Sequence, residues 1–124
     1  MTGRSAGQSR GTMSHFAGHA AEDAVARDYE RRGHRLVARC WRGSRGELDL
    51  VFEDGEGLIV VEVKQAPDFE RALAHLGPAQ LARIHATAEE FAATQPHGPL
   101  TELRFDVALV DGTGQMQFHE NFWA

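Results

Sequence analysis

Two apolar segments joined by a turn constrain the fold of this 124-residue chain more than any other feature. Residues 46–52 and 58–64 are rich in Val, Ile, Leu and Phe, and the link between them contains an Asp-Gly pair. This pattern predicts two antiparallel β-strands connected as a hairpin. Because side chains alternate along a strand, Glu62 and Lys64 lie on one face, while the apolar residues at odd positions of the second strand face the core.

The length of the turn decides whether Asp49 joins this charged face. A four-residue loop over residues 54–57 places Asp49 opposite Glu62, and a two-residue turn at 54–55 places it opposite Val60, on the same face. A loop of odd length turns Asp49 away. With an even-numbered loop, two carboxylates and a lysine converge on one face, which is a suitable arrangement for holding a divalent metal beside a phosphate.

Composition draws attention to Lys64. Twelve of the 13 basic residues are arginine, and Lys64 is the only lysine. The ammonium group is a compact charge whose pKa shifts readily, so it can serve as a point charge or proton donor. Lys64 is therefore a candidate functional residue, and the alternative is a structural ion pair with Glu62. Asp106 also interrupts an apolar strand, and it is either a structural acid or a neighbour of the same site.

The charges are distributed unevenly along the chain. The net charge is −5, yet residues 1–45 contain nine arginines and four acidic residues, whereas residues 46–124 contain four basic and 14 acidic residues. A basic N-terminal half can follow a phosphate backbone, and we identify Arg39, Arg42 and Arg45 as candidate nucleic-acid contacts. The alternative for the same charges is an ordinary solvated surface.

The remaining elements predict a single α/β domain. Residues 1–13 are polar and rich in Gly, Ser and Arg, and we expect them to be disordered, with residues 14–124 forming the domain. Hydrophobic periodicity predicts further elements around the hairpin. They are a helix over 14–32, a strand over 34–41, helices over 69–76 and 78–94, and strands over 103–110 and 116–123. The resulting α-βββ-α-β order predicts a mixed sheet flanked by helices.

Two general features limit the location of the protein. No apolar segment approaches the roughly 20 residues of a membrane span, so we expect no membrane association. The single cysteine, Cys40, excludes an internal disulfide and is typical of a reducing cytoplasm. We expect Cys40 to be an ordinary half-buried strand residue.

The spacing from Asp49 to Glu62-Val63-Lys64 resembles the signature of PD-(D/E)xK nucleases, in which an acid on one strand precedes an E-x-K motif on the next. More closely, the chain resembles the YraN-like family of small bacterial proteins, which is related to Holliday-junction resolvases. The resemblance covers roughly residues 18–124. The matching stretches are 22–27 (Glu-Asp-Ala-Val-Ala-Arg), 31–33 (Arg-Arg-Gly), 46–50 (Gly-Glu-Leu-Asp-Leu), 61–64 (Val-Glu-Val-Lys) and 104–107 (Arg-Phe-Asp-Val).

This resemblance implies a restriction-endonuclease-like core and metal-dependent hydrolysis of DNA, including branched or single-stranded DNA. Asp49, Glu62 and the Val63 carbonyl would bind Mg²⁺ or Mn²⁺, and Lys64 would position water or stabilise transition-state charge. Glu22 would be an accessory acid from the preceding helix, so the implied catalytic residues are Asp49, Glu62, Lys64 and Glu22. A resolvase role would also require a homodimer.

Two departures from the family pattern leave other functions open. The family usually carries Arg two residues after the E-x-K lysine, where this chain has Ala66, and a Lys early in the later helix, where it has Gln80. One alternative is therefore an inactive nuclease-fold module that binds nucleic acid or a partner. Another is an oligomeric scaffold whose aromatic tail, Phe118, Phe122 and Trp123, packs against a partner.

Overall fold

The computed structural model describes the backbone of residues 10–123 and the side chains of residues 19–123. Its elements are α1 (Arg10–Arg31), β1 (Leu36–Arg42), β2 (Glu47–Asp54), β3 (Gly57–Gln65), α2 (Phe69–Ala74), α3 (Pro78–Ala92), the 3-10 helix η1 (Gly98–Leu100), β4 (Leu103–Val110) and β5 (Met116–Trp123). The first helix begins four residues before the predicted start at residue 14, so part of the segment expected to be disordered is helical. The rest of that expectation, for residues 1–9, lies outside the described residues.

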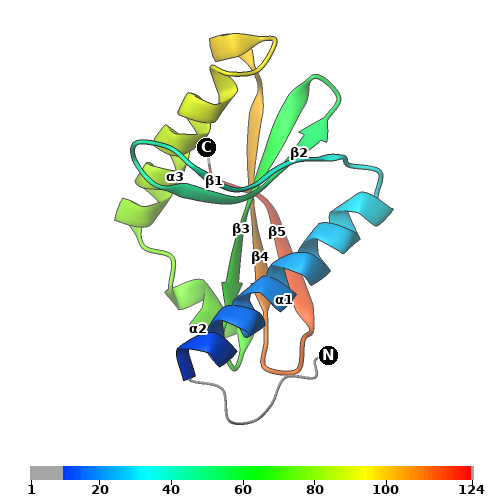
Figure 1. Cartoon of the computed structure of the whole chain (residues 1–124), viewed down its shortest axis with the longest axis vertical. Helices are drawn as coiled ribbons and strands as arrows, with labels where there is room; N and C mark the ends of the chain where they lie inside the picture. Colours follow the sequence, from blue (N-terminus) through cyan, green and yellow to red (C-terminus); the bar gives the residue numbers. More distant parts are fainter. Residues whose placement is uncertain (1–9, 124) are drawn as a thin grey trace.

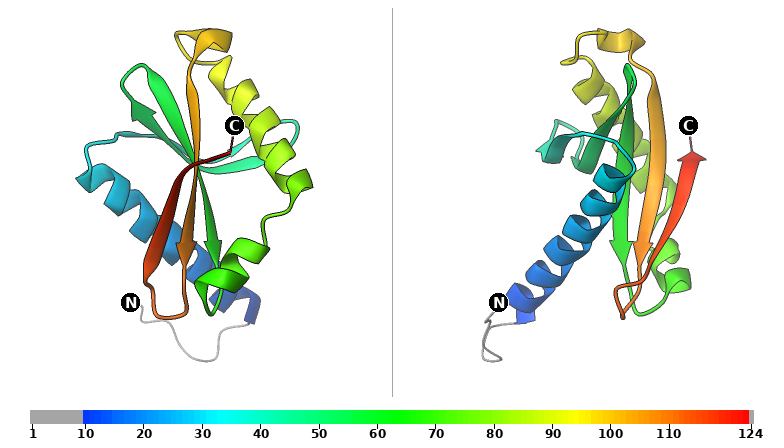
Figure 2. Two further views of the ribbon diagram at one scale, coloured as in Figure 1. Left: turned by 180° about the vertical axis from the view of Figure 1, so that it is seen from behind. Right: turned by 90° about the vertical axis from the view of Figure 1, so that its right-hand side faces the viewer.

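The five strands form one mixed sheet in the order β1-β2-β3-β4-β5. Neighbouring strands are antiparallel except for the central β3–β4 pair, which is parallel and is connected through α2 and α3. Figure 1 and Figure 2 together show that α1 crosses one face of the sheet and that α2 and α3 lie on the other face. The predicted single-domain α/β fold and α-βββ-α-β order are confirmed. No helix among the described residues has the length and apolar character needed to cross a membrane.

Both faces of the central strands are buried, which differs from the predicted single core face. Ile59 and Val61 pack under α1, as expected from their odd positions. Leu58 and Val60, on the face shared with Glu62, pack under α3 instead. Parallel strands are usually covered on both sides, and this accounts for the nearly continuous apolar run in β3. The charged residues of this face therefore lie at the margin of a second apolar core.

The hairpin register brings the two predicted carboxylates opposite each other. Asp54 pairs with Gly57 and Leu50 pairs with Val61. The two-residue turn between the paired ends contains Gly55 at φ 63°, a backbone conformation that glycine adopts without a steric penalty. This is the register predicted for the longer loop; its last pair is Leu50–Val61, and Asp49 next contacts the Val63 backbone N–H. The turn itself is shorter than that loop, because Asp54 and Gly57 are already paired.

Asp106 is a structural acid at the junction of α1, β4 and β5. Its carboxylate is fully buried and accepts hydrogen bonds from the Tyr29 hydroxyl at 2.6 Å, from the Arg104 guanidinium at 2.8 and 3.0 Å and from the Asn121 backbone N–H at 2.9 Å. Burial, together with the adjacent Asp106 carboxylate, raises the pKa of Tyr29 and keeps its hydroxyl protonated. These contacts settle the two alternatives for Asp106 in favour of a structural role.

The aromatic tail packs mainly within the chain. Phe118 lies against the core under α1, and Trp123 packs on Phe105 with a ring-centroid distance of 4.8 Å. Phe122 is the most exposed of the three tail aromatics, at 37%. Most of the apolar surface expected to be available for a partner is therefore already covered by the chain itself.

Candidate functional site

The site is built around Asp49 of β2 and Glu62 of β3. The Asp49 carboxylate accepts a hydrogen bond from the Val63 backbone N–H at 2.8 Å, which fixes the acid against the neighbouring strand. Glu62 is only 5% exposed, since its side chain points toward α3 rather than toward solvent. The two acids thus meet beneath a helix, where a charge is poorly solvated.

Glu62 has an incomplete set of partners. The Lys64 ammonium lies 3.5 Å from its Oε2 atom, and the Gln80 side-chain amide donates to the same atom at 3.3 Å. The other oxygen, Oε1, is buried without a hydrogen-bond partner. A buried carboxylate oxygen without a partner is costly, because it has lost its hydration without replacement. Either a proton held between the two acids or a bound cation would relieve this cost.

The pKa values of both acids respond to this arrangement. Burial, followed by repulsion from Asp49, raises the pKa of Glu62 to about 8, while Lys64 opposes the shift. Burial also raises the pKa of Asp49, against the opposing effects of the Val63 N–H and Lys64. Two adjacent carboxylates cannot both ionise freely in a poorly solvated position. The metal-free pair therefore retains a proton near neutral pH.

A pocket of about 300 Å³ opens between the hairpin and α3. Its strand wall carries Glu47, Asp49 and Glu62, and its helix wall carries Gln80, Arg83 and Thr87. Glu47 lies on the same side of the strand as Asp49. Asp49 and Glu62 thus border a space that small solutes can enter, although the unpartnered Oε1 of Glu62 is itself buried.

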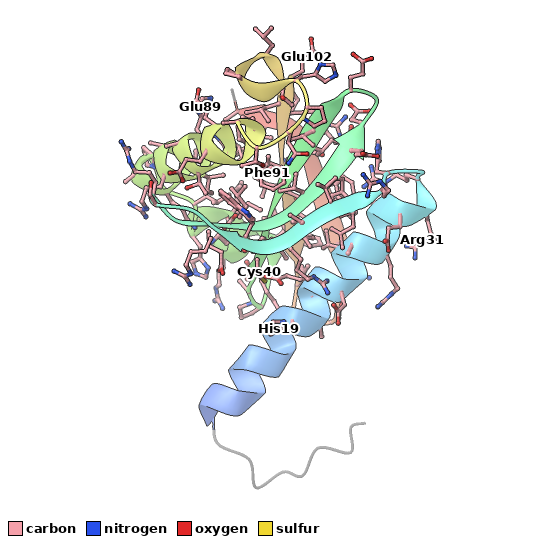
Figure 3. The ribbon with its side chains drawn as sticks, turned by 45° about the horizontal axis from the view of Figure 1, so that its top comes forward. His19, Arg31, Cys40, Glu89, Phe91 and Glu102 are labelled. Atoms are coloured by element: carbon pink, nitrogen blue, oxygen red, sulfur yellow. The ribbon has the colours of Figure 1, made fainter. Side chains whose placement is uncertain are left out.

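Glu22 approaches the same acids from α1. The Cys40 thiol lies 3.7 Å from the Glu22 carboxylate, and Figure 3 shows Cys40 of β1 close to the α1 segment that carries His19. Burial and then repulsion from Asp49 raise the pKa of Glu22, which places the two carboxylates within electrostatic range. Glu22 does not line the pocket under α3. It therefore lies beside the carboxylate pair, and Cys40 is the half-buried strand residue that was expected.

The donor atoms fit a small divalent cation. Asp49 and Glu62 offer hard carboxylate oxygens, and the Val63 carbonyl lies on the same edge of its strand as the N–H that contacts Asp49. Within the described part of the chain, no three His, Cys, Asp or Glu side chains converge closely enough to form a metal cluster. Mg²⁺ commonly binds through one or two carboxylates together with water and substrate phosphates. The pair therefore suits Mg²⁺ or Mn²⁺ better than it suits zinc.

The three predicted nucleic-acid contacts lie in different surroundings. Arg42 and Arg45 are exposed around the loop that leads into the pocket, and Arg42 lies 3.7 Å from Glu47. Arg39 instead forms an ion pair with Asp23 of α1 at 2.7 Å. Arg42 thus contacts a residue that lines the pocket and Arg45 directly precedes Gly46, another lining residue, whereas Arg39 is engaged with α1.

The loop before β2 is held against α3 by Glu90. The Ser44 backbone N–H donates to this carboxylate at 2.8 Å, and the Ser44 hydroxyl donates to its other oxygen. Gly43 approaches Glu90 and Trp41 so closely that a β-carbon there would clash. Arg45 therefore extends from a loop whose position is fixed by α3.

The helix wall of the pocket was not predicted from the sequence. Gln80 was identified only as a missing cation, although it donates to Glu62, while Arg83 and Thr87 were not identified. Their spacing of three, four and seven residues is the available signal, because such residues share a helix face. Ala66 is buried against the core under α2, where a longer charged side chain would not fit without rearrangement.

Comparisons with known proteins agree on one family. Residues 21–110 match the family described as "Uncharacterised protein family UPF0102". A UPF0102 protein of Ruegeria pomeroyi is 58% identical over 113 residues, covering 91% of this chain and 92% of that protein. A UPF0102 protein of Cereibacter sphaeroides is 49% identical over 114 residues, covering 92% and 97%, and one of Roseobacter denitrificans is 49% identical over 111 residues, covering 90% and 86%.

Proposed function

The chain belongs to the uncharacterised protein family UPF0102, which is the YraN-like family, and we propose that it is a divalent-metal-dependent endonuclease acting on DNA. The observation that carries the proposal is the buried Asp49–Glu62 pair, with one Glu62 oxygen unpartnered beside an open pocket. The E-x-K spacing and the placement of Lys64 next to this pair support membership of the PD-(D/E)xK superfamily. The single cysteine suits a protein that works in the cytoplasm.

The chain would contribute three functions to the proposed reaction. Asp49, Glu62 and the Val63 carbonyl hold the cation, and Glu22 orients water or supports a second cation. When bound, the cation polarises the phosphate and lowers the pKa of water. Lys64 places a positive charge near the reacting phosphate, where it stabilises the negative charge that develops during hydrolysis.

Metal binding is tested first, because it does not require the correct substrate. Mg²⁺ should raise the thermal unfolding temperature of the wild-type protein, since a ligand that binds only the folded state stabilises it. Asp49→Asn and Glu62→Gln should lose this response, while Glu30→Gln, an exposed acid on α1, should retain it. A wild-type protein that gains no stability from Mg²⁺ or Mn²⁺ would contradict the proposal.

Turnover is tested with duplex, single-stranded and four-way-junction DNA in Mg²⁺ or Mn²⁺. Lys64→Ala should lower the cleavage rate by about 10²–10³-fold, in the range found when a transition-state charge contact is removed. The two carboxylate variants should be at least as impaired. Equal cleavage by the wild type and all three variants would exclude this site as the source of the activity.

The binding-module alternative is favoured by one observation. Neither position 66 nor position 80 supplies the cation usual in the family, because Ala66 is buried and Gln80 is neutral. A protein that binds Mg²⁺ and DNA but cleaves none of the three substrates would support this alternative over the enzyme.

A further inference from the structure

Arg83 combines two features: it lines the pocket, and its charge has no partner among the described residues. It extends from α3 at the wall of the pocket that holds the carboxylate pair. Its guanidinium forms no ion pair and no hydrogen bond with any described residue. Ion pairs engage seven other arginines with described side chains, namely Arg31, Arg32, Arg35, Arg39, Arg42, Arg71 and Arg104.

The lack of a partner is informative because anionic groups are close by. Three carboxylates, Glu47, Asp49 and Glu62, line the same pocket. Lys64 contacts Glu62 and Arg42 contacts Glu47, so the strand wall already has its own cations. An arginine that remains unpaired at such a pocket is available for an anion that enters from solvent. Guanidinium groups bind phosphate oxygens through two parallel hydrogen bonds, so a phosphate is the anion that fits best.

The backbone at Arg83 is held in place, whereas its charged side-chain end has no described partner. The Thr87 hydroxyl is buried and donates to the Arg83 carbonyl at 2.7 Å, and Ile84 is buried against the sheet. Gln80 lies one helical turn earlier, on the same face of α3 as Arg83. The helix wall thus carries its positive charge at position 83.

We propose that Arg83 binds a phosphate of the DNA substrate. This inference rests on the proposed nuclease function and assigns the substrate contact on the helix wall of that site. Arg83 anchors the substrate and is not a metal ligand, so its loss should weaken DNA binding and leave Mg²⁺ binding unchanged.

The experiment compares Arg83→Ala and Arg83→Lys with Arg27→Ala. Arg27 is a matched control, because it is an exposed arginine on α1 whose side chain also has no described partner. Binding to a short fluorescent DNA duplex is measured at several salt concentrations in Ca²⁺, a cation that also takes oxygen ligands. The Mg²⁺-dependent rise in unfolding temperature is measured on the same proteins.

Arg83→Ala should bind DNA about tenfold more weakly, as expected for the loss of one charge-assisted contact. The slope of log affinity against log salt should become shallower by about 0.9, which corresponds to one phosphate contact, and a purely structural residue would not change it. Arg83→Lys should restore most of this slope, and Arg27→Ala should resemble the wild type.

DNA binding by Arg83→Ala equal to that of Arg27→Ala, or an unchanged salt slope, would overturn the inference while leaving the nuclease proposal intact. Absence of DNA binding by the wild type would overturn it as well. Failure of the nuclease proposal is recognised separately, because the wild type would then show no response to Mg²⁺ in the unfolding measurement.

Discussion

Replacement of Glu62 by glutamine gives the most direct test of the buried carboxylate pair. In the metal-free protein, Glu62 is 5% exposed and has one oxygen without a partner. Glutamine has nearly the same shape but no charge, so it removes both the cost of burying an anion and its repulsion from Asp49. We therefore expect Glu62→Gln to be more stable than the wild type in EDTA at neutral and alkaline pH.

The size of this effect follows from the pKa of Glu62, which is raised from 4.5 to about 8. Between these two pH values the folded chain keeps a proton that the unfolded chain has lost, so the free energy of unfolding falls as pH rises. The contribution is fully present below pH 4.5 and is lost above about pH 8. At about 1.4 kcal/mol per pH unit, the ceiling on the loss is about 5 kcal/mol.

Thermal and urea unfolding of both proteins in EDTA, from about pH 5 to about pH 9, measures this difference. For a domain of this size, 1 kcal/mol corresponds to about 4 °C in Tm, so the advantage of Glu62→Gln should reach about 10 °C or more at the alkaline end. Glu30→Gln, a change at an exposed acid, should follow the wild type at every pH. Parallel pH profiles for the wild type and Glu62→Gln would refute the reasoning, because Glu62 would then titrate normally in the folded chain.

Three further predictions concern the metal, the structural acid and the loop. Mg²⁺ competes with a proton for Glu62, so its apparent affinity, measured by calorimetry, should fall up to about tenfold per pH unit below about pH 8. Asp106→Ala leaves the Arg104 guanidinium without its buried partner and should cost about 3–5 kcal/mol in urea unfolding. The Asp106→Ala variant should still show the rise in unfolding temperature that Mg²⁺ produces in the wild type. Gly43→Ala displaces the Glu90 carboxylate that holds the loop, and it should cost about 1–3 kcal/mol in thermal unfolding.

Sequence patterns predicted the strands and helices well where neighbouring residues alone determine the structure. The bounds of β4 and β5 agree with the predicted strands, since the turn residues between them mark the end of one and the start of the other. The start of α1 was wrong by four residues, because the polar segment before residue 14 has no apolar stripe to mark it as helical. The burial of both faces of β3 was also missed. It depends on the docking of α3, which no local pattern encodes.

The candidate site shows the same difference between what local sequence patterns predict and what depends on the packing of α3. Alternation along β3 and an even-numbered turn were enough to bring Asp49, Glu62 and Lys64 to one face. The contact from Gln80 and the position of Arg83 depend on how α3 lies across the hairpin, and this is a tertiary property. Arg39 was grouped with Arg42 and Arg45 by charge alone, whereas the fold pairs it with Asp23 of α1.

A comparison of the two buried acids in this sheet separates a structural role from a functional one. Asp106 is fully buried, and hydroxyl, guanidinium and backbone N–H donors together satisfy both of its oxygens. Glu62 is nearly as buried, yet one of its oxygens has no hydrogen-bond partner. Its other oxygen contacts the Lys64 ammonium and accepts a long hydrogen bond from the Gln80 amide. The chain therefore has the means to satisfy a buried carboxylate fully and does so only at Asp106. In the metal-free protein a proton retained by the Asp49–Glu62 pair offsets the cost of this buried charge. We propose that a divalent cation, which has the matching charge and preference for oxygen, replaces that proton when it binds.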